Sequence, residues 1–136
     1  MLGKASKKSG VNEMDIQASD KDGINLVIRN YVEGMVFADE ALLRQAFHPS
    51  CYIIGHFQGT LEWLSLNDFV SAILVEGPAA SDVKPFWQVE SMDVTGDTAA
   101  VKIIDDYSGM RFTDYLSLLK VDGHWIITNK LYYCHE

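Results

Sequence analysis

The chain has 136 residues and a mass of 15.2 kDa, which suits a single domain. Hydrophobic residues make up 48% of it and aromatic residues 11%, so a mainly disordered chain is excluded. With 19 acidic residues against 11 basic ones, the net charge is -8, which disfavours nucleic acid and anionic membranes as partners. A small neutral or cationic molecule, or a protein, fits this charge better.

The N-terminal segment is rich in lysine, serine and glycine, and it predicts a flexible leader over residues 1–21 before a single domain over 22–136. No apolar stretch of the kind found in signal peptides follows it, and no run of about 18 apolar residues is present for crossing a membrane. Two cysteines, Cys51 and Cys134, do not make a disulfide scaffold. We therefore expect a reduced protein in the cytoplasm.

Three helices are predicted in the first half of the chain. Apolar residues recur at i, i+3, i+4, i+7 and i+11 over residues 22–38, which indicates one buried helix face. Asp39 is the expected N-cap of a second, short helix, which ends before Pro49. Ser65 is the expected cap of a third helix, which ends at Gly77.

Strands make up the rest of the chain. A β-rich segment over residues 51–57 lies between the second and third helices, and from Val83 onward the period of the pattern is two. Turn residues separate four long strands there, over 83–94, 98–107, 110–121 and 124–134. This order predicts an α+β fold in which the helices lie on one side of a curved sheet.

The two-residue turn at Asp122-Gly123 predicts the pairing of the last two strands. If Val121 pairs with His124 in regular alternation, the inner face carries Phe112, Asp114, Leu116, Leu118, Trp125, Ile127, Asn129, Leu131 and Tyr133. The outer face then carries Lys130 and Tyr132. A buried carboxylate without a partner is costly, so Asp114 is either paired or functional.

The preceding pair of strands places Glu90, Asp105 and Tyr107 on the same inner side, towards the opposite end of the sheet. Glu90 and Asp105 are equally compatible with solvated positions at the rim of the sheet. The inner face is therefore expected to have an apolar end and a polar end.

Three stretches, LLRQAFHPSCYIIG, TGDTAAVKI and FTDYLSLLKVDGHWIITNKLYY, resemble the nuclear transport factor 2-like superfamily with its cystatin-like fold. Within it, the chain is most similar to the putative lumazine-binding group, related to the polyketide cyclase-like and ketosteroid isomerase-like branches. The resemblance covers about residues 22–133. It implies a cone-shaped α+β barrel, with three N-terminal helices packed in the concave face of a highly curved mixed or antiparallel sheet. It also implies a homodimer through the outer sheet face, which here would carry Thr113, Tyr115, Ile126, Thr128 and Tyr132.

The resemblance to ketosteroid isomerase implies roles for single residues. There, a tyrosine of the first helix and a protonated aspartate of the sheet bind the developing oxyanion, while another aspartate moves the proton. Tyr31 falls on the tyrosine, and Asp114 is a sheet aspartate. The position of the proton-moving aspartate falls on Gly55, and the neighbouring His56 points to the opposite face of a regular strand.

Three functions remain open from the sequence. The first is a small-molecule-binding domain for a pteridine-like or other cyclic ligand, with an apolar pocket carrying a few polar groups. The second is an enzyme of the isomerase or dehydratase type that uses Asp114 with His56 or Tyr31. The third is a ligand-free dimeric adaptor with a filled cone. The expected pocket residues are Tyr31, Tyr52, His56, Trp63, Trp87, Asp114, Asn129 and Tyr133. No metal or other cofactor is expected, because the histidines lack the spacing of metal ligands.

Overall fold

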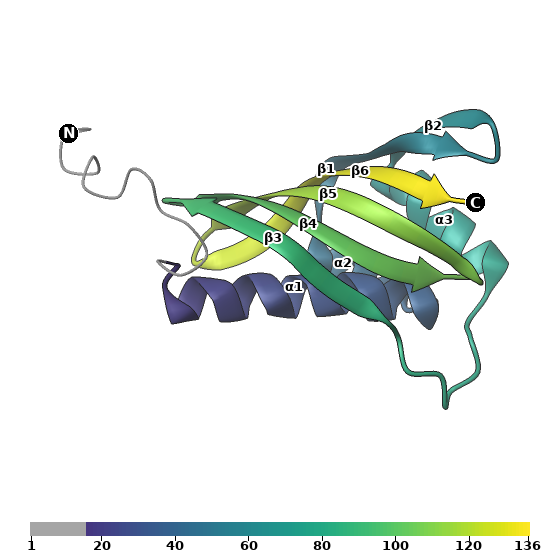
Figure 1. Ribbon diagram of the computed structural model, residues 1–136, viewed down its shortest axis with the longest axis horizontal. Coiled ribbons are helices and arrows are strands. Elements are labelled where there is room, and N and C mark those ends of the chain that lie inside the picture. Colours follow the sequence, from purple (N-terminus) through teal and green to yellow (C-terminus); the bar gives the residue numbers. More distant parts are fainter. Residues whose placement is uncertain (1–15) are drawn as a thin grey trace.

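The computed structural model describes residues 16–136, and most of the predicted leader lies outside this range. The elements follow one another as α1 (Ala18–Val36), α2 (Glu40–Ala46), β1 (Phe47–Phe57), β2 (Thr60–Ser65), α3 (Leu66–Glu76), β3 (Trp87–Thr95), β4 (Thr98–Tyr107), β5 (Met110–Val121) and β6 (His124–His135). Figure 1 shows α1 lying along the sheet, with the four long strands crossing above it. Among residues 16–136, no helix has both the length and the apolar character needed to cross a membrane.

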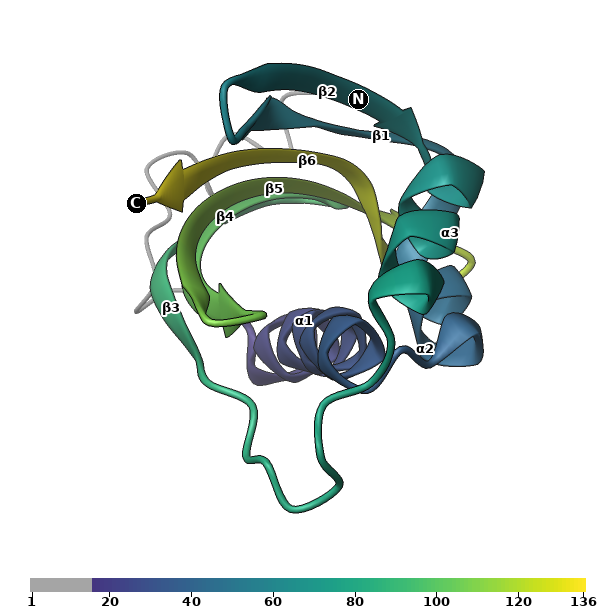
Figure 2. The same cartoon turned by 90° about the vertical axis from the view of Figure 1, so that its right-hand side faces the viewer.

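One six-stranded sheet forms the body of the molecule. Its strand order is β2-β1-β6-β5-β4-β3. The β1–β6 pair is parallel, and all other neighbours are antiparallel. The sheet curls around α1, and α2 and α3 lie along one side of the curl (Figure 2). This is the predicted α+β cone, and it stays open because the edge strands β2 and β3 do not pair with each other.

The first helix begins at Ala18, earlier than predicted, so residues 18–21 belong to it and not to a leader. A contact between the first turn of α1 and the hairpin of β5 and β6 explains why the helix begins at this residue. The Asp20 carboxylate lies 2.6 Å from the Lys120 ammonium and accepts a hydrogen bond of 3.2 Å from the Trp125 indole. A carboxylate in a first turn also interacts favourably with the helix dipole.

Both predicted helix caps are confirmed. The Asp39 carboxylate accepts a hydrogen bond from the Leu42 amide, and the Ser65 hydroxyl accepts one from the Asp68 amide, each at 3.2 Å. These side chains satisfy amides at the start of α2 and α3 that have no partner within the helix. The strand predicted from Val83 begins only at Trp87. Pro85 lacks an amide hydrogen for the ladder, and residues 77–86 form a loop between α3 and β3.

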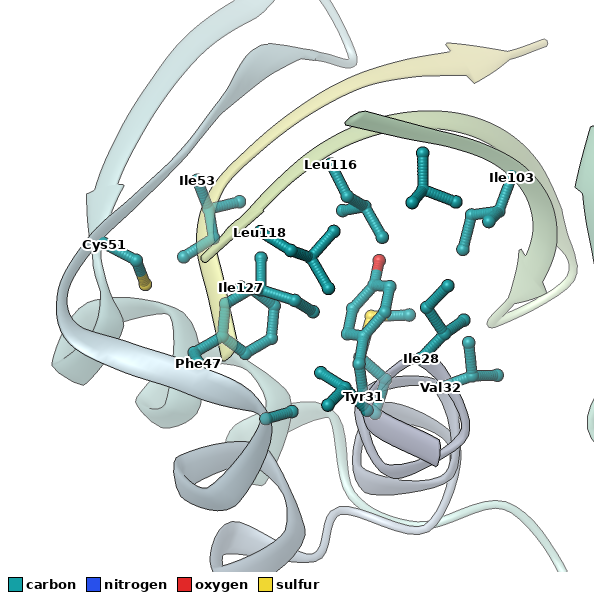
Figure 3. Packing of buried hydrophobic residues seen from close by; sticks show 14 of the residues in the cluster. Ile28, Tyr31, Val32, Phe47, Cys51, Ile53, Ile103, Leu116, Leu118 and Ile127 are labelled. Atoms are coloured by element: carbon teal, nitrogen blue, oxygen red, sulfur yellow. The ribbon is translucent and has the colours of Figure 1, made fainter. Parts of the chain in front are cut away.

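The core fills the space between α1 and the concave face of the sheet. Figure 3 shows Tyr31 rising from α1, with its hydroxyl oxygen directed at the sheet and aliphatic side chains around its ring. The Tyr31 ring meets the edge of Phe47, with 5.2 Å between the ring centroids. The Tyr31 hydroxyl thus reaches the sheet through the aliphatic part of the core.

A β-bulge in the last hairpin changes which side chains face inward. Leu118 pairs with Ile127, as regular alternation from Val121 and His124 predicts. Ser117 then pairs with Asn129, so Thr128 is the extra residue that stands opposite no residue of β5 in the strand register. The extra residue shifts every later pair by one position, and a shift of one turns each side chain to the other face. The predicted faces of the C-terminal half of β6 are therefore wrong: Lys130 and Tyr132 are buried inside, whereas Leu131 and Tyr133 are exposed outside.

Candidate functional site

A buried hydrogen bond joins the first helix to the sheet. The Tyr31 hydroxyl donates to Oδ2 of Asp114 at 2.7 Å, and both side chains are fully buried. Burial and the nearby carboxyls raise the pKa of Tyr31 well above its ordinary value, so it remains a hydrogen-bond donor. The sequence-based expectation that Asp114 faces inward is confirmed.

A second carboxyl group lies beside the first. Asp105 on β4 is fully buried, and burial together with the charge of Asp114 raises its pKa well above the ordinary value. Its two oxygens and Oδ1 of Asp114 have no hydrogen-bond partner among the described residues. A proton on Asp105 resolves this, because the protonated group donates a hydrogen bond to Asp114.

A buried amino group lies next to this pair. Lys130 is 4% exposed, and its Nζ lies 4.7 Å from the Tyr31 ring centroid and 4.9 Å from that of Phe69. It also donates to the Met35 sulfur at 3.8 Å. Its positive charge acts on Asp105 and partly offsets the rise in the pKa of that carboxyl. The cluster therefore places the Lys130 amino group near the Tyr31 ring and near the two buried carboxyl groups.

One row of side chains crosses the concave face from β2 to β5. Glu62 is paired with Gly55, Gly55 with Tyr132, and Tyr132 with Asp114. Cross-strand partners project from the same face of a sheet. The Tyr132 hydroxyl donates to Oε1 of Glu62 at 2.6 Å, across the position where glycine has no side chain. Lys130 lies on the same strand and the same face, two residues before Tyr132.

A cavity of about 180 Å³ lies against this row. Polar groups come from Glu62, Glu76, Tyr107, Lys130 and Tyr132, and the rest of the wall is apolar: Met35, Ile53, Phe57, Leu64, Phe69, Ala72, Ile73 and Phe112. The Tyr107 hydroxyl is buried without a hydrogen-bond partner in the described part of the chain. Burial and the charge of Glu76 raise the pKa of Tyr107 to about 12. The cavity thus combines aromatic and aliphatic walls with hydroxyl, amino and carboxylate groups.

Gly55 is required by close packing. A Cβ at this position would lie 2.6 Å from the Tyr132 carbonyl oxygen and 2.8 Å from two carbons of its ring. An aspartate at this position, as in ketosteroid isomerase, therefore cannot be accommodated beside Tyr132. The carboxylate on this part of the concave face is instead Glu62, one strand away.

The expected pocket residues lie in different places. Tyr31 and Asp114 are together in the buried cluster behind the cavity, and Trp87 is half-buried against the core. Asn129 is half-buried next to the bulge. The others, namely Tyr52, His56, Trp63 and Tyr133, are exposed on the outer side of the sheet. There, His56 and Tyr133 line a separate groove.

Sequence reasoning missed Lys130, Tyr132 and Glu62. The bulge at Thr128 hides the first two, because both faces of the final strand carry large apolar residues and either alternation gives a plausible core. Glu62 lies in a short segment with no alternation strong enough to assign its face. Their contacts within the site are made with residues of other strands and helices, which the local sequence does not reveal.

Within the described part of the chain, His, Cys, Asp and Glu side chains form no group of three that could hold a metal ion. The side chains of the cluster itself include carboxyl, hydroxyl and amino groups. These can hold and move protons, and they can place positive charge beside an oxygen atom.

The curved open sheet around α1 defines a nuclear transport factor 2-like α+β cone. Two solved structures of nuclear transport factor 2-like proteins of unknown function share it. The protein of Silicibacter pomeroyi is 29% identical, with a TM-score of 0.81 over 88% of this chain and 100% of that one. The protein of Shewanella baltica is 28% identical, with a TM-score of 0.78 over 89% of this chain and 98% of that one.

The family model described as "Putative lumazine-binding" matches residues 19–133, and the chain belongs to this family. Among curated proteins, the chain is similar to "Aldolase FrzH" of a Cladobotryum species. The two are 24% identical over 120 residues, which cover 88% of this chain and 95% of the relative.

Proposed function

We propose that the cavity binds a small ketone or aldehyde, and that the protein catalyses proton transfer at the carbon next to the carbonyl group. The observation that carries this proposal is the row of ionisable groups against an apolar cavity: Glu62, Tyr132 and Lys130, backed by Asp114 and Asp105. Burying such groups costs stability, and an apolar core of the same volume would avoid that cost. Clusters of this kind are typical of catalytic sites.

The size and walls of the cavity support a compact ligand. Its volume of about 180 Å³ is below the roughly 300–1,000 Å³ of pockets for drug-sized molecules. Stacked rings of Phe57 and Phe112, 6.5 Å apart, form part of the wall and suit a flat or cyclic body. The filled cone expected of a ligand-free adaptor would leave less space than this cavity.

The roles of the side chains follow from their positions. The Glu62 carboxylate lines the cavity and accepts a proton from the carbon next to the carbonyl group. The amino group of Lys130 and the hydroxyl of Tyr107 face the carbonyl oxygen, where negative charge develops. Tyr31 and Asp114 do not line the cavity and act through Lys130, so they are positioning residues.

This chemistry is compatible with two of the functions left open by the sequence, namely binding of a small molecule and catalysis of the isomerase type. It is also compatible with the name of the curated relative. Removing the proton gives an enolate, and returning it to a different carbon is an isomerisation. Addition of the same enolate to an aldehyde is an aldol reaction, and the relative carries the name aldolase. The alternative is binding of a pteridine-like ligand such as lumazine, the molecule in the family description, and lumazine is included in the ligand panel.

The direct test is hydrogen exchange in deuterium oxide. Cyclic ketones, β-keto esters and small aldehydes are incubated with the protein, and loss of the proton next to the carbonyl group is followed by NMR. We expect Glu62→Gln to slow exchange by roughly 100-fold or more, because general bases contribute about 10²–10⁴-fold. Glu90→Gln, an exposed change on β3, is the matched control and should behave as wild type. Equal rates in Glu62→Gln and wild type would contradict the proposal.

We also propose that two copies associate through the outer face of the sheet. Large side chains are exposed there on four strands: Tyr52, Leu61, Trp63, Tyr115, Leu131 and Tyr133. Trp63, Leu131 and Tyr115 lie in one row, linked through Ile54 of β1. A continuous apolar patch of this kind is typical of an interface between proteins. Tyr132, expected on this face from the sequence, lies on the concave side instead.

A further inference from the structure

Lys130 holds a primary amine in the wall of an apolar cavity, without a carboxylate bound to it. The ion pairs found among residues 16–136 involve Arg44, Arg111 and Lys120. Around Nζ of Lys130 lie the rings of Tyr31, Phe69 and Tyr132 and the Met35 sulfur. Resting on the proposed function, we propose that this amine forms a Schiff base with the carbonyl carbon of the bound ketone or aldehyde.

The surroundings of Nζ favour a nucleophile over a permanent ion pair. A lysine amine in an apolar pocket is the usual precursor of a Schiff base, because little water surrounds it and its nitrogen lone pair is available once the proton is lost. Contacts with the aromatic rings and the hydrogen bond to the Met35 sulfur also hold the Lys130 side chain in one position. The amine is therefore placed before the substrate arrives.

The carboxyl pair provides a destination for the ammonium proton. The raised pKa of Asp105 favours its protonated form, and Asp114 lies beside it. In the proposed step a proton moves from Nζ of Lys130 to Asp114, which leaves the amine and both carboxyl groups neutral, and an interior of low dielectric tolerates neutral groups. The Tyr31 hydroxyl stays hydrogen-bonded to Asp114 and holds the acceptor in place.

The bonds and protons of the step balance. Neutral Nζ attacks the carbonyl carbon, so a C–N bond forms while the C=O π electrons move to oxygen. Nζ then loses a proton, and the oxygen gains two and leaves as water, which gives a protonated imine. Glu62 takes the proton from the neighbouring carbon, and the resulting enamine carbon bonds to an aldehyde or is protonated again. Water hydrolyses the imine and restores Lys130, with no change in oxidation state.

Two probes test this without knowledge of the natural substrate. Acetylacetone converts a nucleophilic lysine to a conjugated enaminone, which is seen as a new near-ultraviolet band. Benzaldehyde with cyanoborohydride fixes an imine as a stable amine, which peptide mass spectrometry places on one residue. We expect both adducts on Lys130 of the wild-type protein at neutral pH, ahead of the surface lysines. Adducts spread over surface lysines, or absent from Lys130 with both probes, would overturn the proposal.

Variants separate this inference from the proposed function. Lys130→Arg keeps a positive charge but cannot form the imine, so it should lose both adducts and the exchange activity. Lys102→Arg alters a lysine that lies against Tyr115 on the outer side, 5.6 Å from its ring centroid, and should keep both. If Lys130→Arg still exchanges protons like wild type, the Schiff base is refuted while the proposed function stands. If the wild-type protein exchanges no substrate in the panel, the proposed function itself fails. Site mapping in the wild-type protein does not depend on the folding of any variant.

Discussion

Gly55 of β1 and Tyr132 of β6 are partners in the parallel strand pair, and the Tyr132 ring fills the space that a side chain at Gly55 would need. This contact lies in the middle of the row from Glu62 to Asp114. The concave face therefore has an aromatic ring beside Gly55, and the nearest strand partner on the other side of Gly55 is the carboxylate-bearing Glu62.

Gly55→Ala should destabilise the fold, because the new methyl group would lie 2.6 Å from a backbone oxygen that cannot move freely. Overpacking of this kind typically costs about 1–3 kcal/mol. Urea unfolding followed by circular dichroism measures the change. Gly59→Ala is the control. Gly59 has a positive φ of 81° and open space around it, so this variant measures the cost of backbone strain without the cost of crowding. Wild-type stability in Gly55→Ala would show that the backbone and the ring of Tyr132 both shift at no cost.

Tyr31→Phe removes the donor to Asp114 and leaves a buried carboxylate oxygen without a partner. We expect a loss of about 1–3 kcal/mol in the free energy of unfolding. The matched control is Tyr115→Phe, because that side chain is 49% exposed on the outer face. A Tyr31→Phe protein as stable as wild type would indicate that Asp114 takes another donor.

Asp105→Asn should change how stability depends on pH. The pKa of Asp105 is raised in the folded state, so the unfolded chain loses this proton first as the pH rises above about the ordinary value of 3.8. The stability from the protonated group is fully present below that pH. It is lost by about 1.4 kcal/mol per pH unit up to the raised folded pKa.

Asparagine does not titrate, so the difference in unfolding free energy between Asp105→Asn and wild type should grow in favour of the variant across this range. Urea unfolding at a series of pH values measures it. Asp93→Asn, exposed on β3, should run parallel to wild type. A difference that does not vary with pH would mean that the pKa of Asp105 is not raised in the folded state.

Trp63→Glu should disrupt association through the outer face, because the Trp63 side chain is 61% exposed and belongs to the apolar patch. Sedimentation velocity or light scattering on wild type is expected to give a dimer, and on the variant a monomer. Val75→Glu, at an 88% exposed position on α3, adds the same charge away from the patch. A monomeric wild-type protein would refute the proposed dimer.

Local patterns in the sequence determined much of this architecture. Helix periodicity, the caps at Asp39 and Ser65, and the turn at Asp122-Gly123 depend on neighbours within a few residues, and the structure contains all of them. Alternation along β5 was also sufficient to place Asp114 inside. Together with Tyr31 on the buried face of the first helix, this gave one half of the candidate site.

The other half depended on tertiary structure. Thr128 donates a hydrogen bond to the Ser117 carbonyl at 3.0 Å at the bulge, and this extra residue brings Lys130 and Tyr132 to the concave face. Both alternations of β6 bury large apolar side chains, so the sequence of the strand does not distinguish them. Pairing with β5 and β1 and packing against α1 decide between them, because only one arrangement sets Lys130 beside the carboxyl pair and Tyr132 beside Gly55.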